Sequence, residues 1–358
     1  ARFALSYRST VHTMAPAGAK QLRIVVSAEE AGQRLDRWLA ARLPELSRTR
    51  IQELIAQGRV RIHGAPAKPS RKIAAGEIIE VEAVPRAVLA AQPEAIPLDV
   101  LYEDEDVAVV NKPAGMVVHA GAGAASSSGT LVNALLHRYR HLPSGNAESA
   151  GLRPGIVHRL DKETSGVVVV ARNDHAHAQL GAQFAARKVQ KTYLALLHGK
   201  LKGESGAIDL PVARDLHRRT RMTTRRRNGR AASTHWRVLL RMESGAGRAR
   251  TAFTLTEVDL RTGRTHQIRV HFSAIGHPVV GDTLYGAPAQ LHLAGRALPR
   301  LPRNFLHAAR ICFLHPRLGT PLEVRAPLPD ELQSYLRQLA AATDTAPQSV
   351  DAVLRAFI

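Results

Sequence analysis

Four consecutive valines at positions 167–170 predict a buried strand. Polar and charged residues come directly before it, namely His158, Arg159, Asp161, Lys162 and Glu163. A carboxylate at the edge of a core is costly to desolvate unless a cation or hydrogen-bond donors face it, and a carboxylate held in this way is a candidate for chemistry. A turn in which Asp161 accepts backbone N–H bonds explains the same pattern, so the residue types alone leave both interpretations open.

Hydrophobic residues at helical spacing predict two short helices after Gly32. The first ends at Pro44, and the second begins after an N-cap at Ser47 and ends at Gly58. The inward positions are Leu35, Trp38, Leu39 and Leu43 in the first helix and Ile51, Leu54 and Ile55 in the second. Residues 59–63 and 77–82 alternate between polar and apolar and predict two strands.

Beyond residue 96 the pattern predicts a mixture of strands and helices. Strands are expected on both sides of an acidic turn within residues 98–119, over residues 191–198 and 268–272, and around residues 307–316. Helices are expected to start near residues 129–136, to cover residues 176–186, and to close the chain from Leu328. Residues 120–128 are rich in glycine, alanine and serine, which is typical of a mobile surface loop.

The length of 358 residues and a hydrophobic content of 45% favour two globular domains. We expect a disordered extension over residues 1–20, a first domain over 21–84, a linker over 85–95, a second domain over 96–340, and a tail or helix over 341–358. The extension has no acidic residue, which is also typical of organelle transit peptides. An upstream start before Met14 is the simpler explanation.

The chain is strongly basic, with 50 Lys and Arg against 30 Asp and Glu, a formal net charge of +20 and a pI near 11.1. This charge favours a polyanionic partner, with nucleic acid preferred over a membrane surface. No apolar run approaches the roughly 20 residues that a membrane span needs. Cys312 is the only cysteine, so neither a disulfide framework nor a thiolate zinc site is expected, and a reducing, cytoplasmic compartment fits.

Seventeen histidines raise the question of a metal site. None stands in a His-Glu-x-x-His or two-cysteine pattern, and His175 and His177 on a predicted helix cannot place both rings on one face. The sequence also lacks a glycine-rich phosphate loop and a dinucleotide fingerprint. We therefore expect no metal site.

The loop before the buried strand carries a longer motif. His158-Arg159-Leu160-Asp161 followed by Thr164-Ser165-Gly166 resembles the signature loop of the RluA family of pseudouridine synthases. Four further segments resemble the same family in the same order, at residues 111–113, 129–136, 191–195 and 263–269. The resemblance runs from about residue 32 to residue 329. It is greatest to the large-subunit ribosomal branch, which joins an S4 module to the catalytic domain.

This resemblance implies an α+β fold in which a small S4 domain precedes a mixed, mainly antiparallel β-sheet with a central cleft. It implies an enzyme that isomerises uridine in RNA to pseudouridine without a cofactor. The glycosidic bond breaks, the base rotates while it is held, and a carbon–carbon bond to ribose forms. The expected partner is a structured stem-loop of large-subunit ribosomal RNA, and the expected enzyme is a monomer.

The roles of individual residues also follow from the resemblance. Asp161 would be the catalytic aspartate, Tyr193 would pack on the target base or serve as base, and Arg264 would pair with Asp161 and keep it ionised. A core tyrosine and a surface arginine are the ordinary alternatives for Tyr193 and Arg264 taken singly. The remaining substrate-binding positions would be a pocket-lining residue, a loop histidine and a wedge that replaces the flipped base, namely Ile268, His158 and Arg159.

Two groups of arginines are expected to hold the RNA. The helices and strands of residues 32–82 resemble the S4 RNA-binding module, whose contacts would come from Arg37, Arg48, Arg50, Arg59 and Arg61. Cations at a helix start gain nothing from the helix dipole, so a docked polyanion explains them better than a solvated face. A second basic segment, residues 214–230, predicts an exposed hairpin or loop that meets phosphates through Arg218, Arg221 and Arg225.

Three other functions stay open on the sequence alone. An RNA-binding or ribosome-assembly factor with the same fold would bind RNA without isomerising it. A pseudouridine synthase that acts on tRNA would share the site but not the substrate. A metal-dependent RNA phosphoesterase that uses His158 and Asp161 would lose activity in a chelator.

Overall fold

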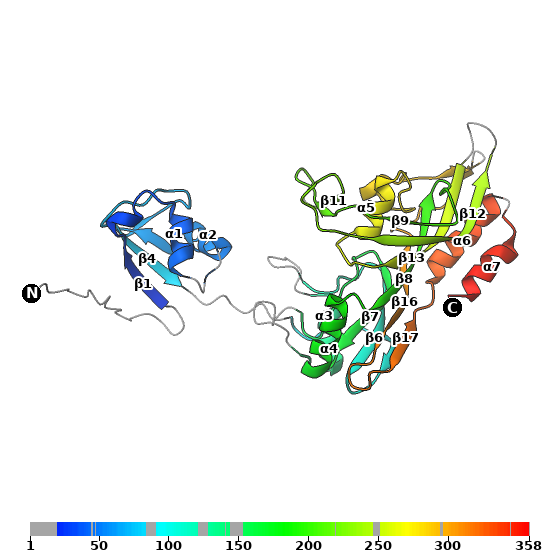
Figure 1. The fold of residues 1–358 in the computed structure, drawn as a ribbon, viewed down its shortest axis with the longest axis horizontal. Helices are drawn as coiled ribbons and strands as arrows, with labels where there is room; N and C mark the ends of the chain where they lie inside the picture. Colours follow the sequence, from blue (N-terminus) through cyan, green and yellow to red (C-terminus); the bar gives the residue numbers. More distant parts are fainter. Residues whose placement is uncertain are drawn as a thin grey trace, which may run out of the picture. The chain divides into compact units, whose positions relative to one another are not determined.

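A computed structural model of the chain describes residues 20–43, 46, 48–83, 91–120, 128–139, 141–143, 153–218, 220–245, 251–293, 296–343 and 345–357. Residues 1–19 of the expected extension, the expected N-cap Ser47, and large parts of the expected linker and of loop 120–128 lie outside this description. Contacts divide the chain into two compact units, Ala1–Val88 and Leu89–Ile358. Figure 1 shows both units.

The first unit is a small antiparallel sheet that shares one hydrophobic core with two helices. Its strands, in the order β1-β4-β2-β3, are β1 (Lys20–Val25), β4 (Ile78–Ala83), β2 (Val60–Ile62) and β3 (Ala65–Pro66). A 3-10 turn covers Ala28–Glu30, and the helices are α1 (Leu35–Arg42) and α2 (Arg48–Ala56). Both predicted helices and both predicted strands are confirmed, and all their predicted inward residues are buried. The pattern did not predict β1 or β3, and β1 begins at Lys20, inside the expected extension.

The second unit is built on a nine-stranded sheet. Its path runs through β5 (Asp99–Glu103), β6 (Val107–Lys112), β7 (Ser165–Ala171), β16 (Leu306–Leu314), β8 (Gln190–His198), β13 (Thr251–Leu260), β12 (Thr234–Ser244) and β9 (Ser205–Ile208). The ninth strand, β17 (Pro321–Arg325), pairs with β16. Only β16 and β7 are parallel among these pairs, so the predicted α+β class with a mixed, mainly antiparallel sheet is confirmed. Two short ribbons, β10 (Ala213–Arg214) with β11 (Met222–Thr223) and β14 (His292–Leu293) with β15 (Arg296–Ala297), are separate from it.

Helices flank this sheet at its two ends. Figure 1 shows α3 (Leu131–Tyr139) and α4 (Asp174–Ala185) near β6 and β7, and α6 (Asp330–Ala342) and α7 (Pro347–Arg355) near β12. A 3-10 turn covers Thr283–Tyr285. The helices predicted near residues 129–136 and 176–186 and after Leu328 are confirmed. Among the described helices none has the length and hydrophobicity needed to cross a membrane.

Strand β7 is buried along its whole length, as its four valines predict. At its start Gly166 has φ 117° and lies so close to β16 that a Cβ atom there would collide with the carbonyl oxygen of Ala308. Glycine is the residue that tolerates this backbone conformation and this close approach. The loop that contains Asp161 therefore enters the sheet beside its central strands.

The strand predicted over residues 268–272 is wrong, because these residues belong to helix α5 (Gln267–Ala274). The order Ile-Arg-Val-His-Phe alternates apolar and polar residues, which is typical of a half-buried strand. Arg269 and His271 are nevertheless buried, because Arg269 pairs with Asp282 and the Nε2 atom of His271 lies 3.0 Å from the carbonyl oxygen of Leu210. A helix whose polar residues find buried partners thus produces the same alternation.

Candidate active site

The loop between Asp161 and β7 is held through its own backbone carbonyls. The carbonyl oxygen of Asp161 accepts from the backbone N–H of Thr164 at 3.1 Å, which closes a turn. The carbonyl of Lys162 accepts from the backbone N–H of Gly115 at 2.9 Å. Each peptide that follows Asp161 therefore has a fixed orientation, and the direction of the Asp161 side chain is fixed with it.

The side chain of Lys112 also holds this loop. Its side chain is fully buried, and its Nζ atom donates to the carbonyl oxygens of Pro113, Met116 and Lys162 at 2.7, 2.9 and 3.1 Å. Burial lowers the pKa of Lys112 to about 7. The sequence motif at residues 111–113 thus holds the backbone of the Asp161 loop through Lys112.

Arg303 is a second buried residue that holds this loop, and no sequence pattern predicted its role. Its Nη1 atom donates to the carbonyl oxygen of Glu163 at 3.2 Å, its Nη2 atom to the Ser165 hydroxyl at 3.2 Å, and its Nε atom to Glu331 at 2.6 Å. The partners lie 140 and 28 residues away, so sequence spacing carries no signal of these contacts. Arg303 thereby ties the Asp161 loop to the first turn of α6.

The Asp161 carboxylate is 17% exposed and faces a single arginine among the described residues. Its Oδ2 atom lies 3.4 Å from Nη1 of Arg269, and its Oδ1 atom lies 4.0 Å from Nε2 of His266. Arg269 is held on its other edge by Asp282, with Nε–Oδ2 and Nη2–Oδ1 distances of 2.6 and 2.9 Å. Burial alone would lower the pKa of Arg269, but the Asp282 and Asp161 carboxylates raise it, so the arginine stays charged.

Arg264, expected to pair with Asp161, forms no ion pair with it in the described structure. Its Nε atom lies 3.4 Å from the carbonyl oxygen of Ala231, and its backbone N–H donates to the Gln267 side chain at 3.0 Å. The difference follows from α5, because a helix in place of the predicted strand carries the second arginine of the same motif, Arg269, to the carboxylate. The motif contains both arginines, and the one in contact with Asp161 stands five positions after the predicted one.

A small pocket of about 80 Å³ contains Asp161. Tyr193 and Ile268, both expected at the substrate, are buried and line this pocket together with Arg269. Burial, and secondarily the charge of Asp161, raise the pKa of Tyr193. The Tyr193 hydroxyl therefore keeps its proton at neutral pH. A protonated Tyr193 is better suited to contact a nucleobase than to abstract a proton as a general base.

His158 and Arg159 lie in the loop segment that leads to Asp161. The Nε2 atom of His158 accepts from the backbone N–H of Val169 at 2.8 Å, and its ring stacks on Phe184 with centroids 4.7 Å apart. Burial lowers the pKa of His158 to about 3, so this ring is neutral and serves to fix the loop. Arg159 is exposed and borders the pocket of Asp161.

Comparison with known proteins bears on this arrangement. Residues 106–274 match the family model described as RNA pseudouridylate synthase, and residues 33–79 match the S4 domain model. The chain is 42% identical over 329 residues to the ribosomal large subunit pseudouridine synthase D of Xanthomonas campestris, a match that covers 90% of this chain and 94% of that protein. The chain belongs to the RluA family of RNA pseudouridine synthases.

Further matches agree with this family. The RNA pseudouridine synthase YlyB of Bacillus subtilis is 40% identical over 319 residues, which are 89% of this chain and 98% of that protein. Among solved structures, human RNA pseudouridylate synthase domain containing 1 is 28% identical with a TM-score of 0.50, covering 76% of this chain and 98% of that chain. The predicted family, its S4 domain and its activity as an RNA pseudouridine synthase, an isomerase, are confirmed.

The arginines predicted to hold RNA in the S4 domain fall into two kinds. Arg37 and Arg61 are exposed. Arg48 pairs with the buried carboxylate of Asp36 at 2.7 Å, and Arg59 pairs with Glu82 at 3.0 Å. The position of Arg48 at a helix start therefore has an internal explanation that the sequence did not suggest, and the side chain of Arg50 lies outside the described structure.

The basic segment 214–230 of the synthase forms the predicted hairpin, with β10 paired to β11. Arg218 and Arg225 are exposed, whereas Arg221 lies over the ring of Tyr285 at 5.2 Å. The Tyr285 hydroxyl accepts from the backbone N–H of Met222 at 2.8 Å and lies 2.8 Å from Nδ1 of His266. The hairpin thus contacts, through one tyrosine, the residues around Asp161.

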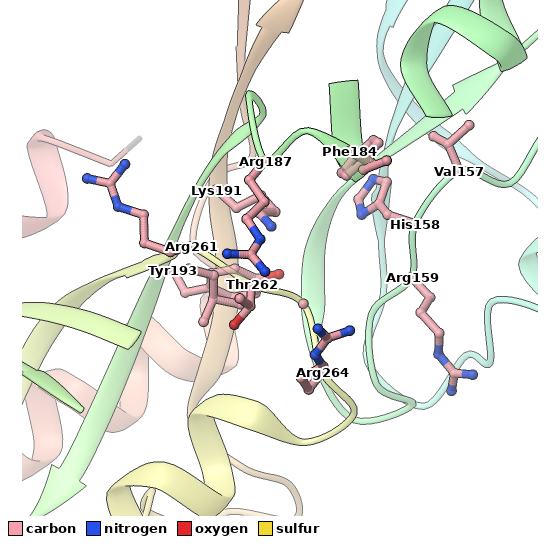
Figure 2. A pocket seen from close by; sticks show the side chains of 13 residues that line it. Val157, His158, Arg159, Phe184, Arg187, Lys191, Tyr193, Arg261, Thr262 and Arg264 are labelled. Atoms are coloured by element: carbon pink, nitrogen blue, oxygen red, sulfur yellow. The ribbon is translucent and has the colours of Figure 1, made fainter. Parts of the chain in front are cut away.

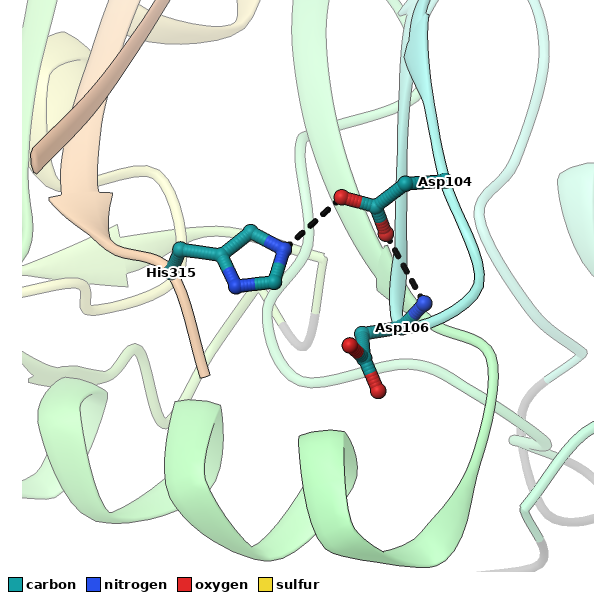
Figure 3. Close-up of side chains that lie close together, drawn as sticks. All are labelled: Asp104, Asp106 and His315. Atoms are coloured by element: carbon teal, nitrogen blue, oxygen red, sulfur yellow. Dashed lines mark hydrogen bonds and ion pairs between the residues drawn. The ribbon is translucent and has the colours of Figure 1, made fainter. Parts of the chain in front are cut away.

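Away from this site, Asp104, Asp106 and His315 bring potential metal-ligating atoms within 4.8 Å of one another (Figure 3). Asp104 already accepts from the Tyr102 hydroxyl, from Nε2 of His315 at 2.7 Å and from two backbone N–H groups. Asp106 pairs with Arg317 at 2.7 Å. Because both carboxylates have partners of their own, the cluster is explained as a polar tie between the β5–β6 turn and the turn after β16.

Proposed function

We propose that this synthase isomerises uridines in large-subunit ribosomal RNA, with Asp161 as its catalytic residue and without a cofactor. The observation that carries this assignment is the 3.4 Å contact between Asp161 and Arg269 inside the pocket lined by Tyr193 and Ile268. The substrate class is supported by relatives named ribosomal large subunit pseudouridine synthase D, among them that of Nitrosomonas europaea at 42% identity.

In the proposed reaction the bond between N1 of uracil and C1′ of ribose breaks, and C5 of the base becomes bonded to C1′. The proton on C5 is lost and N1 gains one, so the atoms balance without an oxidant or reductant. Asp161 acts as an ionised carboxylate, which either adds to the sugar or base or assists removal of a sugar proton. Tyr193 and Ile268 hold the detached uracil while it rotates.

Arg269 has two functions in this scheme. Its positive charge stabilises the carboxylate form of Asp161, and its bidentate contact with Asp282 keeps the guanidinium from turning away. Lys112 and Arg303 hold the loop backbone, so the carboxylate does not have to be ordered when substrate arrives. To enter the small pocket, the uracil must leave its stacked position in the RNA. Unstacking costs a few kcal/mol, which contacts between the protein and the RNA offset.

The role of Asp161 is tested by a substitution, and the substrate class by mapping the modified uridines. Asp161→Asn keeps the shape of the side chain and removes its charge, so it is expected to abolish tritium release from C5-labelled uridine while RNA binding persists. Residual activity within about tenfold of wild type would rule out Asp161 as the essential group.

The substrate class is tested by mapping pseudouridines in ribosomal and transfer RNA from cells with and without the gene, and with the Asp161→Asn gene. Sites that disappear from large-subunit ribosomal RNA are expected. Loss confined to tRNA would contradict the proposed substrate, and an unchanged map together with intact RNA binding would indicate an RNA-binding factor.

A further inference from the structure

A second and larger pocket, of about 350 Å³, opens beside the pocket of Asp161. Its lining includes five cationic side chains and no carboxylate. These cations are Arg159, Arg187, Lys191, Arg261 and Arg264. A volume above about 300 Å³ is in the range of pockets that hold small ligands. The lining therefore has the size and the charge for an anionic group.

The charge of this lining is not compensated by the protein. Within the described part of the chain, none of the five side chains forms an ion pair with a carboxylate. Elsewhere in the same unit arginines are paired, for example Arg303 with Glu331 at 2.6 Å and Arg241 with Glu204 at 2.6 Å. Burial lowers the pKa of Lys191, as expected for an ammonium group that is desolvated without a counter-ion. Like charges that converge without a partner favour the binding of an anion.

Three of the cations converge on one space. Figure 2 shows the side chains of Arg187, Lys191 and Arg264 pointing into the middle of the pocket, whereas Arg159 and Arg261 extend away from it on opposite sides. The three come from the turn after α4, from β8 and from the turn before α5.

The two pockets are continuous along one wall. They share Arg159, Tyr193, Leu260, Gly263 and Arg264. An RNA strand with its target uracil beside Asp161 can therefore continue past Tyr193 and Arg264 into the larger pocket. A ribose phosphate is the part of such a strand that carries the negative charge.

We propose that the larger pocket is a subsite for the phosphodiester that flanks the target uridine, held by Arg187, Lys191 and Arg264. This subsite rests on the proposed function of the smaller pocket. Phosphate contacts fix the register of a nucleic acid on a protein, so the subsite positions the flipped nucleotide without reading its sequence. The two guanidinium groups offer planar pairs of donors that match phosphate oxygens, and Lys191 adds a point charge.

The experiment uses a target stem-loop RNA in which one phosphodiester next to the uridine, on either its 5′ or its 3′ side, is a neutral methylphosphonate. Binding is measured with the full-length Asp161→Asn enzyme, so that turnover does not interfere. Arg187→Gln and Lys191→Gln are made in this background. Lys188→Gln is the matched control, because Lys188 is exposed, adjacent in sequence and absent from the pocket lining.

Arg187→Gln is expected to weaken binding of the unmodified RNA by about tenfold or more and to reduce the salt slope by about 0.7, while Lys188→Gln changes neither. One of the two methylphosphonates is expected to weaken the parent enzyme similarly and to abolish the further effect of Arg187→Gln, because both remove the same contact. Additive effects at both positions, or an equal loss from Lys188→Gln, would overturn the subsite. Wild-type enzyme that forms no pseudouridine in the unmodified RNA would instead contradict the proposed function.

Discussion

The geometry around Asp161 assigns different tasks to two arginines of one motif. Arg269 lies between the carboxylates of Asp161 and Asp282, and Arg264 lies in the wall that the two pockets share. A cation between two mostly buried carboxylates is difficult to replace, because its removal leaves two negative charges facing each other. Arg269 is therefore expected to control the rate of the reaction, and Arg264 the affinity for RNA.

We predict that Arg269→Met lowers the single-turnover rate by about a hundredfold, since a charge-assisted contact to Asp161 is lost. Arg269→Lys keeps the charge but loses the planar fork and is expected to fall between this variant and wild type. Arg264→Met is expected to weaken RNA binding more than it slows the saturated enzyme. Single-turnover rates and thermal melting of all three variants check this, and a saturated rate for Arg264→Met as low as that of Arg269→Met would contradict it.

Single residues also show what sequence patterns omit. Asp161, Tyr193 and Ile268 stand in long motifs, and all three line the smaller pocket. Lys112 belonged to a matched motif but had no role, and Arg303 had no signal at all, because its contacts to Glu163 and Ser165 cross about 140 residues of sequence. Long-range hydrogen bonds have no periodicity, so they become visible only when the fold brings their partners together.

At the scale of elements, the same limit explains the error at α5. The alternation of residues 268–272 predicted a strand, and the partners that bury Arg269 and His271 come from other segments. The buried strand β7 and the helices α1 and α2 were predicted because their apolar residues alone define a face or a core run. Elements whose burial depends on polar partners are the ones that the pattern misassigns.

Tyr285 connects the arginine hairpin to α5. Its hydroxyl accepts from the Met222 N–H, so its own proton is available to Nδ1 of His266, which leaves the Nε2–H of His266 facing Asp161. Its ring also lies 5.0 Å from the guanidinium carbon of Arg269.

We predict that Tyr285→Phe keeps this ring contact but leaves the Met222 N–H without its partner, at a cost of about 1–3 kcal/mol to the local structure. Hydrogen exchange at Met222 should become faster and the rate of isomerisation should fall by about tenfold. Unchanged exchange at Met222 would mean that the hairpin is fixed by other contacts, and exchange at residues of β7 serves as the internal control.

The tie between the β5–β6 turn and the turn after β16 gives a pH dependence. Burial would raise the pKa of Asp104, but the Tyr102 hydroxyl, two backbone N–H groups and His315 lower it to about 2 from 3.8. Because the folded pKa lies below the unfolded one, this stabilisation is complete above about pH 4 and is lost as the pH falls towards 2.

We predict that the free energy of unfolding of wild type falls by up to about 2 kcal/mol relative to that of Asp104→Asn as the pH falls from 4.5 to 2. This is the pH range between the unfolded and folded pKa values of Asp104. Urea denaturation of both proteins across this range measures the difference. At pH 7 wild type should be the more stable protein. If the unfolding free energies of the two proteins changed in parallel with pH, Asp104 would have the same proton affinity in the folded and unfolded chain.

At the scale of the whole molecule, the formal charge of +20 is distributed over two units with separate cores. In the S4 unit Arg37 and Arg61 are exposed, whereas Arg48 and Arg59 are partly neutralised by Asp36 and Glu82. In the catalytic unit the exposed cations include Arg218 and Arg225 of the 214–230 hairpin and Arg187 of the pocket beside Asp161. RNA affinity is therefore expected to come from both units, and chemistry from the second alone.

Deleting residues 1–84 tests this division. We predict that the truncated enzyme binds its ribosomal RNA stem-loop more weakly and with a smaller slope of log affinity against log salt, because phosphate contacts of the S4 unit are lost. Its rate at saturating enzyme should stay near that of wild type, since every contact described around Asp161 lies within Leu89–Ile358. Full-length Arg37→Gln with Arg61→Gln should reproduce part of the slope change. An unchanged slope after the deletion would show that the S4 arginines form a solvated surface, with RNA held by the catalytic unit alone.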